Sequence, residues 1–460
     1  MKFDLFGYKV TISLVSRNSP LREIYYNDGM SNFYQRALLP NGLQVLMHRA
    51  AALNSVTIEA AIKAGPRYED QNNIGVAHFL EHMLFEGTRK FPTSKELALF
   101  LENKGGISSA WTSKENVVYY VKVPKWNLET AFDYLSEILF NSTLSGPDIE
   151  KEKKIIQEEL SRRIDNSEVQ IFDEWFEWVW GKEQTLGRST IGSPETIQSV
   201  TRIKLQNYLL SFYQPENIVL GVAGNFNSKE VLKYCKQYFG RKSFGKKAGR
   251  FSKTQFVPKD NVVQIIQKET RQAYLMLGFV TGVHYLHEDR FPFRLVTDIL
   301  SLGVSSRLFH RLVYELGLAY SAGAYSWSFT DTGLFYTYGG FSPDKIVQAI
   351  EIIVEELQKL KEETISGVEL DIVKEKDTAS VLFNLEPPEA LADYLSTSQL
   401  LEKRVLTPEQ LAIEVKKITP SKIQEISNKY FNRRNLAVTI IGPIVKKDSS
   451  KIEEVLKSLN

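Results

Sequence analysis

Apolar residues between positions 73 and 87 follow the i, i+3, i+4 spacing of an amphipathic α-helix in the run NIGVAHFLEHMLFEG. Asn73 is a candidate N-cap and Gly87 a candidate C-terminal stop, so we predict one helix here. Further runs with strand or helix periodicity surround it. Strands are predicted in 38–49, 55–65, 108–113 and 116–124, and helices near 93–106, 125–141 and 147–165.

One pattern occurs twice along the chain, in residues 193–226 and again in residues 407–444. Each copy begins with Ser/Thr-Pro-Glu, continues through an aromatic pair, and ends in Asn, a strand-like run and Gly. The copies begin at residues 193 and 407, much farther apart than the period of a solenoid repeat, which is about 20–50 residues. The repeat therefore indicates duplicated domains.

Residues 240–253, GRKSFGKKAGRFSK, lack apolar periodicity and are rich in Gly, Lys, Arg and Ser, which is typical of a linker. The predicted organisation is an N-terminal extension and two domains joined by this linker, with boundaries 1–35, 36–240, 241–253 and 254–460. Strands and helices mix in both halves. We therefore predict an α+β protein of two homologous sandwich-like domains, each a mixed sheet with helices packed on it.

Composition narrows the function classes. The 460 residues carry 57 basic and 55 acidic side chains, a balance that gives no nucleic-acid footprint. The single cysteine excludes an internal disulfide. Because we find no apolar run of about 18 residues, we expect no membrane span. The N-terminus is a poor secretory signal, and we expect a cytoplasmic protein.

Two of only six histidines, His78 and His82, lie four residues apart on the predicted helix with Glu81 between them. Side chains at i and i+4 share a helix face about 5–6 Å apart, so both imidazoles can bind one Zn²⁺. Glu81 can then act as the general base toward water on the metal. The alternative is a pair of surface histidines, but the order His-x-x-Glu-His in a histidine-poor chain favours an inverted zinc-peptidase motif.

A catalytic zinc needs a third protein ligand, and the predicted helix 147–165 offers Glu158 and Glu159. Glu159 shares its helical stripe with Ile149 and Ile156, whereas the stripe through Glu158 is basic and polar. Glu159 is therefore the predicted ligand. Glu152 lies two turns earlier on the same stripe, and we predict that it orients a ligating histidine.

With these motifs, the sequence resembles the pitrilysin family of inverzincins, which includes insulin-degrading enzyme and the mitochondrial processing peptidase. AHFLEHMLFEGT (77–88) is similar to the family's metal helix at nearly every position, and the interval to Glu159 is similar to the family's. The resemblance covers roughly 36–445 and fits the half-size members. It implies two homologous domains per chain, and a dimer that encloses a chamber for peptides or unfolded segments.

The resemblance also implies substrate-binding residues. SAWTSKENVVYYVKV (109–123) is similar to the strand that receives the substrate, which assigns Ala110 and Trp111 to substrate binding. A motif in the second half, 305–321, assigns Tyr320. Two positions depart from the family pattern: Ser109 replaces a frequent asparagine, and Val313 replaces the arginine seven residues before Tyr320.

We therefore expect a zinc-dependent endopeptidase. The departure at Val313 has two explanations. The one that we favour is a heterodimer, in which a homologous partner lacks the zinc motif but keeps both the arginine and the tyrosine. The other is a homodimer of altered activity. Two other functions stay open. One is a non-catalytic binding or assembly subunit that retains the metal site, and the other is a hydrolase of some other amide.

Overall fold

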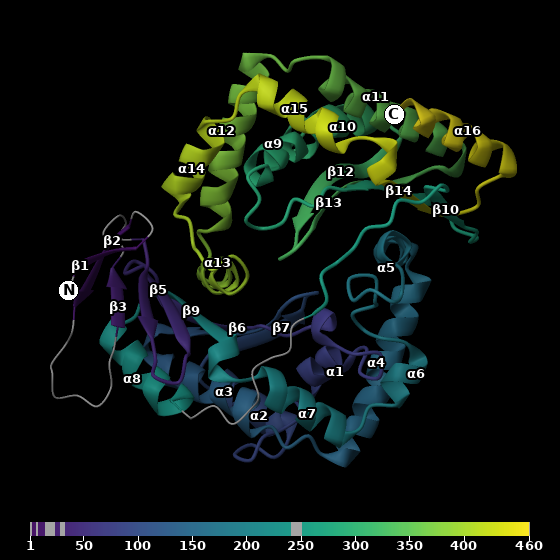
Figure 1. Cartoon of the computed structure of the whole chain (residues 1–460). Helices are drawn as coiled ribbons and strands as arrows, with labels where there is room; N and C mark the ends of the chain where they lie inside the picture. The colour runs from purple at the N-terminus through teal and green to yellow at the C-terminus, as the bar shows by residue number, and fades with distance from the viewer. Residues whose placement is uncertain (1, 6–7, 14–23, 28–32, 241–250, 460) are drawn as a thin grey trace. The chain divides into compact units, whose positions relative to one another are not determined.

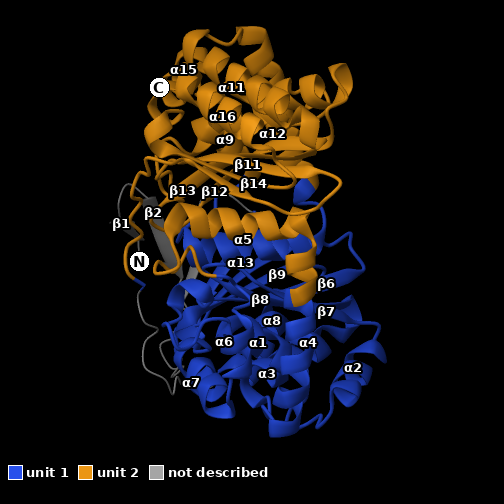
Figure 2. Cartoon of the chain, turned by 90° about the vertical axis from the view of Figure 1, so that its right-hand side faces the viewer, with its two compact units in different colours: residues 1–160, 189–251, 384–407 blue, residues 161–188, 252–383, 408–460 orange. Residues whose placement is uncertain are grey.

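The computed structural model of the chain describes residues 2–5, 8–13, 24–27, 33–240 and 251–459. Two compact units are formed from interleaved segments (Figure 2). Unit 1 comprises Met1–Leu160, Ser189–Phe251 and Asn384–Thr407. Unit 2 comprises Ser161–Arg188, Ser252–Phe383 and Pro408–Asn460.

Unit 1 is built on a mixed nine-stranded sheet in the order β1-β2-β3-β4-β5-β9-β6-β8-β7 (Figure 1). Its strands are β1 (Lys2–Leu5), β2 (Tyr8–Ser13), β3 (Ile24–Asn27), β4 (Gln35–Leu38), β5 (Gln44–Arg49), β6 (Ser55–Ile62), β7 (Ile107–Thr112), β8 (Val117–Pro124) and β9 (Ile218–Gly224). Strand β9 runs parallel to β5 and antiparallel to β6. At one end of the sheet, β7 pairs with β8 and forms an edge.

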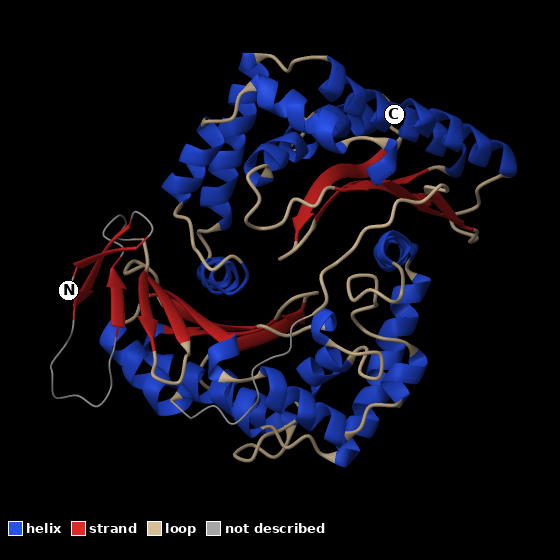
Figure 3. Cartoon of the chain, in the orientation of Figure 1, coloured by secondary structure: helices blue, strands red, loops and turns tan. Residues whose placement is uncertain are grey.

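Helices pack on one face of this sheet (Figure 3), where alternate residues of β6, from Val56 to Ile62, enter the main apolar core. These helices are α1 (Val76–Met83), α2 (Ser94–Glu102), α3 (Leu128–Asn141), α4 (Gly146–Asp165), α6 (Pro194–Gln198), α7 (Arg202–Phe212) and α8 (Ser228–Phe239). The period-2 alternation of β6 therefore directs one set of side chains toward the helix layer that includes α1, which carries both histidines.

Unit 2 repeats the arrangement with a five-stranded sheet in the order β10-β14-β11-β13-β12. Its strands are β10 (Val263–Ile266), β11 (Ala273–Val280), β12 (Ala319–Ser328), β13 (Gly333–Phe341) and β14 (Leu436–Ile441). Its helices include α9 (Arg290–Ser301), α10 (Arg307–Phe309), α11 (Ile346–Glu362), α12 (Gly367–Asn384), α14 (Pro408–Lys416), α15 (Pro420–Tyr430) and α16 (Lys446–Leu456).

Five strands of the unit 1 sheet, in the order β5-β9-β6-β8-β7, correspond in order and direction to the five strands of the unit 2 sheet. Strand β14 is parallel to β10 and antiparallel to β11, as β9 is to β5 and β6. The repeated sequence patterns end in β9 and β14, so the duplication seen in the sequence is a duplication of the sheet. The predicted α+β class, with two mixed sheets carrying helices, is confirmed.

Each unit takes one helix from the other half of the sequence. Helix α5 (Ser167–Trp180) belongs to unit 2, where the Trp175 indole donates a 3.0 Å hydrogen bond to the Ala437 carbonyl of β14. Helix α13 (Pro388–Leu401) belongs to unit 1, where Leu391, Ala392 and Leu395 pack on the second face of the sheet.

The observed units therefore differ from the predicted domains 36–240 and 254–460 by this exchange. Strands β1 to β3 of the predicted extension 1–35 join the unit 1 sheet. Most of the predicted linker, 241–250, lies outside the described residues. Across the described parts of the chain, no helix combines the length and the apolar character needed to cross a bilayer.

Candidate metal centre

Helix α1 begins later than its sequence predicted. Gly75, not Asn73, is the N-cap, with a φ of 87° that favours glycine. Any Cβ at this position would lie 2.7 Å from the Ile191 carbonyl oxygen. The Glu69 carboxylate accepts hydrogen bonds from the backbone N–H groups of Gly75 and Ala77, at 2.8 and 2.7 Å. A distant carboxylate thus performs the capping that we predicted for Asn73.

The apolar face of α1 fixes the direction of its two histidines. Phe79, Leu80 and Met83 are buried in the unit 1 core. His78 and His82 lie on another face, with ring centroids 4.8 Å apart. Their side chains remain 13% and 25% exposed, so an ion between them is reachable from solvent.

Helix α4 brings its inward stripe to the same place. Ile149, Ile156 and Leu160 are buried, and Glu158 is exposed. Glu159 lies beside both histidines: its two carboxylate oxygens are 3.7 Å from His78 Nε2 and 3.6 Å from His82 Nε2. The apolar stripe on which the sequence places Glu159 is therefore the face of α4 that packs into the core, and Glu158 lies on the exposed face.

These three side chains fit a zinc ion. One donor atom of each lies within 4.8 Å of the other two, and they form the one such group of His, Cys, Asp or Glu side chains among the described residues. Donors at about 2.0–2.1 Å from a tetrahedral zinc are about 3.3–3.4 Å apart, close to the 3.6–3.7 Å between the Glu159 oxygens and the two Nε2 atoms. Two imidazoles with one carboxylate also match a known catalytic zinc set that leaves a fourth position open.

Glu152 contacts His82 from the opposite side of the imidazole. Its Oε2 lies 3.1 Å from His82 Nδ1, and its side chain is 4% exposed. An ionised carboxylate can only accept, so Nδ1 carries the proton and the Nε2 lone pair points toward Glu159. Burial lowers the pKa of His82, but the hydrogen bond and negative charge of Glu152, with Glu159 and Glu81, raise it overall.

Glu81 lies on α1 between the histidines and accepts a 2.5 Å hydrogen bond from the Thr112 hydroxyl at the end of β7. Burial raises the pKa of Glu81, against the opposing effects of Thr112 and His82. Sequence reasoning assigned no role to Thr112. The available signal was the alternation of β7, which puts Thr112 on the same face as Ala110.

The predicted substrate-binding residues of unit 1 lie on the same edge strand. Along β7, Ser109 and Trp111 are exposed while Ala110 and Thr112 are partly covered. Trp111 is 38% exposed and contacts the Tyr120 ring across the strand pair, with centroids 6.1 Å apart. Among the described strands, none pairs with the outer edge of β7.

The remaining predicted residue, Tyr320, lies on β12 of unit 2 and is 96% exposed. Val313 lies in a π-helical turn, His310–Glu315. The neighbouring Arg311 donates hydrogen bonds to Glu356 at 2.6 Å and to Glu355 at 2.9 Å. Arg311 is thus held by two carboxylates of α11, and it does not stand in for an arginine at position 313.

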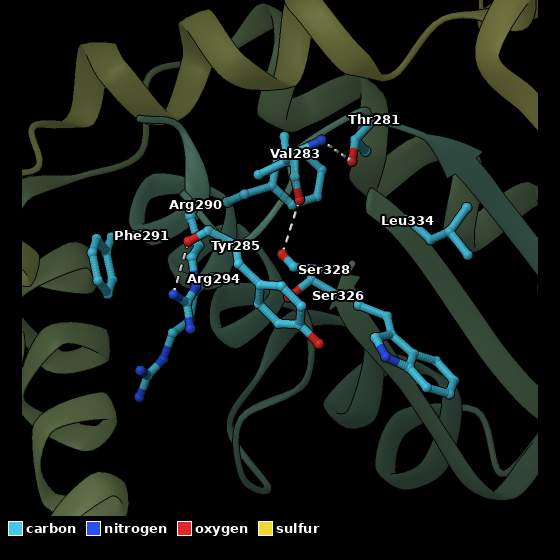
Figure 4. Close-up of a pocket in the computed structure, with 11 residues that line it drawn as sticks. Thr281, Val283, Tyr285, Arg290, Phe291, Arg294, Ser326, Ser328 and Leu334 are labelled. Carbon is cyan, nitrogen blue, oxygen red and sulfur yellow. Dashed lines mark hydrogen bonds between the residues drawn. The ribbon is translucent and has the colours of Figure 1, made fainter. Parts of the chain in front are cut away.

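Unit 2 has a pocket of about 280 Å³ beside the N-terminus of α9 (Figure 4). Several of its polar groups bond to the surrounding backbone. Arg290 donates to the Tyr285 carbonyl at 3.0 Å, and the Ser328 hydroxyl donates to the Val283 carbonyl at 2.9 Å. Arg294 pairs with Asp377 at 2.5 Å. The pocket lining contains no cluster of metal-binding side chains.

The chain matches two family models. Residues 44–193, which include the histidine pair and both α4 carboxylates, match "Insulinase (Peptidase family M16)". Residues 199–376 match "Peptidase M16 inactive domain".

Relatives and solved structures agree with these models. The uncharacterized zinc protease YmxG of Bacillus subtilis is 30% identical, with 89% of this chain and 98% of that protein covered. Mitochondrial-processing peptidase subunit beta of Blastocladiella emersonii is 29% identical, with 88% of each covered. A crystal structure of a protease from Helicobacter pylori has the same fold, with a TM-score of 0.82, 24% identity, and coverage of 89% of this chain and 99% of that one. The chain therefore belongs to the insulinase family, peptidase family M16.

Proposed function

We propose that the chain is a zinc-dependent endopeptidase that hydrolyses peptides or unfolded segments, with Glu81 as its general base. The observation that carries this proposal is the approach of the Glu159 carboxylate to within 3.6–3.7 Å of Nε2 of His78 and of His82, with Glu81 on the same helix as the histidines. Relatives named zinc proteases support both the metal and the reaction class.

His78 and His82 through Nε2, and Glu159 through its carboxylate, would hold the ion. Zinc bound there supplies Lewis-acid polarisation and lowers the pKa of water to about 7. Glu81 takes a proton from the attacking water and passes it to the leaving amine. The Thr112 hydroxyl keeps the Glu81 carboxylate in position through both transfers.

The outer edge of β7 is the proposed binding surface for the substrate backbone. An extended peptide can add a strand to an exposed sheet edge, which gives affinity through backbone hydrogen bonds. Trp111 would contact substrate side chains on one face of that added strand, and Ala110 and Thr112 leave room on the other. This mode selects unfolded segments, because a folded substrate has no free strand to donate.

The test of the reaction is the Glu81→Gln variant, assayed for zinc content and for cleavage of an unstructured peptide. We expect about one zinc per chain in both proteins, and cleavage by the wild type that a chelator abolishes. The variant should retain zinc and lose at least about a hundredfold in kcat, the usual contribution of a general base. A variant that cleaves at the wild-type rate would exclude Glu81 as the base.

A non-catalytic subunit that retains the metal site is the second candidate. The match of residues 199–376 to an inactive-domain model favours it, as does Val313, where the family resemblance implies an arginine. The resemblance implies that the arginine absent here helps to bind the substrate and to stabilise the tetrahedral oxyanion, and the loss of one such donor typically costs about 10²–10³ in rate. A dimer resolves this difficulty if a homologous partner, itself without the zinc motif, supplies an intact arginine–tyrosine pair to a shared chamber.

Light scattering and peptide cleavage, with and without such a partner, separate these possibilities. We expect a dimer, and cleavage that rises when the zinc-bearing chain meets its partner. If the chain cleaves no peptide either alone or with its partner, although its zinc site is filled, the result would favour the non-catalytic subunit.

A further inference from the structure

Lys151 of α4 pairs with two carboxylates behind the metal centre. Its Nζ pairs with Oε2 of Glu86, in the turn that follows α1, and lies 3.8 Å from Oε1 of Glu152. The second oxygen of Glu152, Oε2, contacts His82 Nδ1 at 3.1 Å. The carboxylate that orients a ligating histidine is therefore held through both of its oxygens, by His82 on one and by Lys151 on the other.

These contacts connect the two helices that supply the candidate zinc ligands. The backbone N–H of Glu86 donates to the Met83 carbonyl at 3.3 Å, so the turn that carries Glu86 continues directly from the end of α1. Lys151 lies in α4, about two turns before Glu159. Lys151 thus reaches from the helix of the third ligand to the end of the helix that carries both histidines.

Glu86 and Glu152 are also close to each other. Burial raises the pKa of Glu86; the hydrogen bond and charge of Lys151 oppose this rise, and the charge of Glu152 adds to it. The two side chains are only 14% and 4% exposed, so solvent screens their repulsion poorly. Two neighbouring carboxylates do not both ionise readily unless a cation compensates them. Among the described residues, the cation that pairs with both is Lys151.

The stability of the fold gives little reason for Lys151 at this position. Its side chain is half exposed, and an exposed ion pair contributes little to stability. Removal of the lysine has a larger consequence at the metal centre, because it leaves two covered carboxylates side by side. One of them must then turn away, and any turn of Glu152 breaks its contact with His82.

We propose that Lys151 is a positioning residue of the metal centre. It compensates the charge of Glu86 and thereby keeps the Glu152 carboxylate in contact with His82. This role rests on the proposed zinc peptidase and deepens it, because it concerns the same metal centre. Zinc binding then depends on the positive charge at position 151 only while Glu86 carries its negative charge.

The test is a set of zinc affinities, measured by competition with a chromogenic chelator. The variants are Lys151→Met, Glu86→Gln, the double variant that combines them, and Lys154→Met, the same change at another exposed position of α4. We expect Lys151→Met to weaken zinc binding about tenfold, the lower end of the usual effect of disturbing a partner behind a ligating histidine. Glu86→Gln and Lys154→Met should bind zinc as the wild type does. The double variant should recover most of the lost affinity, because the amide no longer repels Glu152.

A simple tie between α1 and α4 would give a different pattern. Glu86→Gln and Lys151→Met would then weaken zinc binding alike, and the double variant would recover nothing, which would overturn the proposed role. An unchanged affinity in Lys151→Met would overturn it as well. The thermal midpoint of the zinc-free protein should be the same in Lys151→Met and Lys154→Met. A midpoint lowered in Lys151→Met and not restored in the double variant would assign the lysine to the fold instead.

Peptide cleavage by the same proteins separates this role from the proposed function. Recovery of zinc affinity in the double variant, when even the wild type cleaves no peptide, would overturn the peptidase and leave the role of Lys151. Equal zinc affinities in all the variants, with cleavage intact, would overturn the role of Lys151 and leave the peptidase.

Discussion

At the scale of single residues, Glu152 fixes the tautomer and orientation of His82, because its carboxylate lies 3.1 Å from Nδ1. We predict that Glu152→Gln weakens zinc binding by about 10–100-fold, as is usual when a carboxylate behind a ligating histidine is lost. The amide keeps the shape but not the charge. Competition against a chromogenic chelator measures the change, and an affinity equal to that of the wild type would remove Glu152 from the metal site.

Thr112 is expected to act on the reaction and not on the metal. Thr112→Val keeps the side-chain volume and deletes the hydroxyl that holds Glu81. A hydrogen bond to a charged group contributes about 1.5–3 kcal/mol, so kcat should fall by roughly 10–100-fold. Zinc content per chain should not change. Loss of zinc together with activity would show that Thr112 supports the fold of the site instead.

At the scale of elements, α13 meets β6 through two acidic side chains, the buried Glu59 of β6 and the half-buried Asp393 of α13. Glu59 of β6 is fully buried and accepts a 2.6 Å hydrogen bond from Ser396 of α13. Burial raises the pKa of Glu59, helped by the charge of Asp393, and burial raises the pKa of Asp393 to about 6. Lys122 of β8 pairs with Glu389 of α13 in the same interface, at 2.7 Å.

Both raised pKa values have the same consequence for stability. Above about pH 4 the unfolded chain has released protons that the folded protein still holds. The free energy of unfolding therefore decreases as the pH rises through about 6, by up to about 1.4 kcal/mol per pH unit for each proton.

We predict that Glu59→Gln flattens this decrease. The amide can accept from Ser396 and donate to Asp393 without ionising. The thermal midpoint of the variant should exceed that of the wild type at pH 8 and approach it at pH 5, in scans by differential calorimetry. Glu230→Gln serves as the exposed control. Parallel midpoints for Glu59→Gln and wild type across this range would show that ionisation of Glu59 does not cause the decrease.

At the scale of the whole molecule, the exchange of α5 and α13 makes each half of the sequence incomplete. Residues 1–245 alone would leave Leu46, Ala61 and Val118 without the α13 residues that cover them. We predict that this half, expressed alone, binds a hydrophobic dye and aggregates. Co-expressed with 246–460, it should co-purify as a folded pair. A monodisperse N-terminal half that unfolds cooperatively at the wild-type temperature would contradict this.

The periodicity and spacing of residues in the sequence were sufficient to predict the local helices and strands and the class of fold. The stripe of α4 separated Glu159 from Glu158, and the repeat preceding β9 and β14 indicated the duplicated sheet. The start of α1 was predicted too early, because Glu69 caps it from outside the local sequence. The helix exchange was missed because both sheets present apolar faces, and amphipathicity does not identify the sheet that a helix covers. Thr112 was missed because its role depends on a pairing across 31 residues.

The convergence of α1 and α4 on one ion is the central claim, and a matched pair of variants tests it most directly. Glu159→Gln and Glu158→Gln make the same change at adjacent positions, one beside the histidines and one on the exposed face. After dialysis against a zinc buffer, we expect Glu158→Gln to keep about one zinc per chain and Glu159→Gln to lose most of it. Equal zinc contents in the two variants would contradict the account.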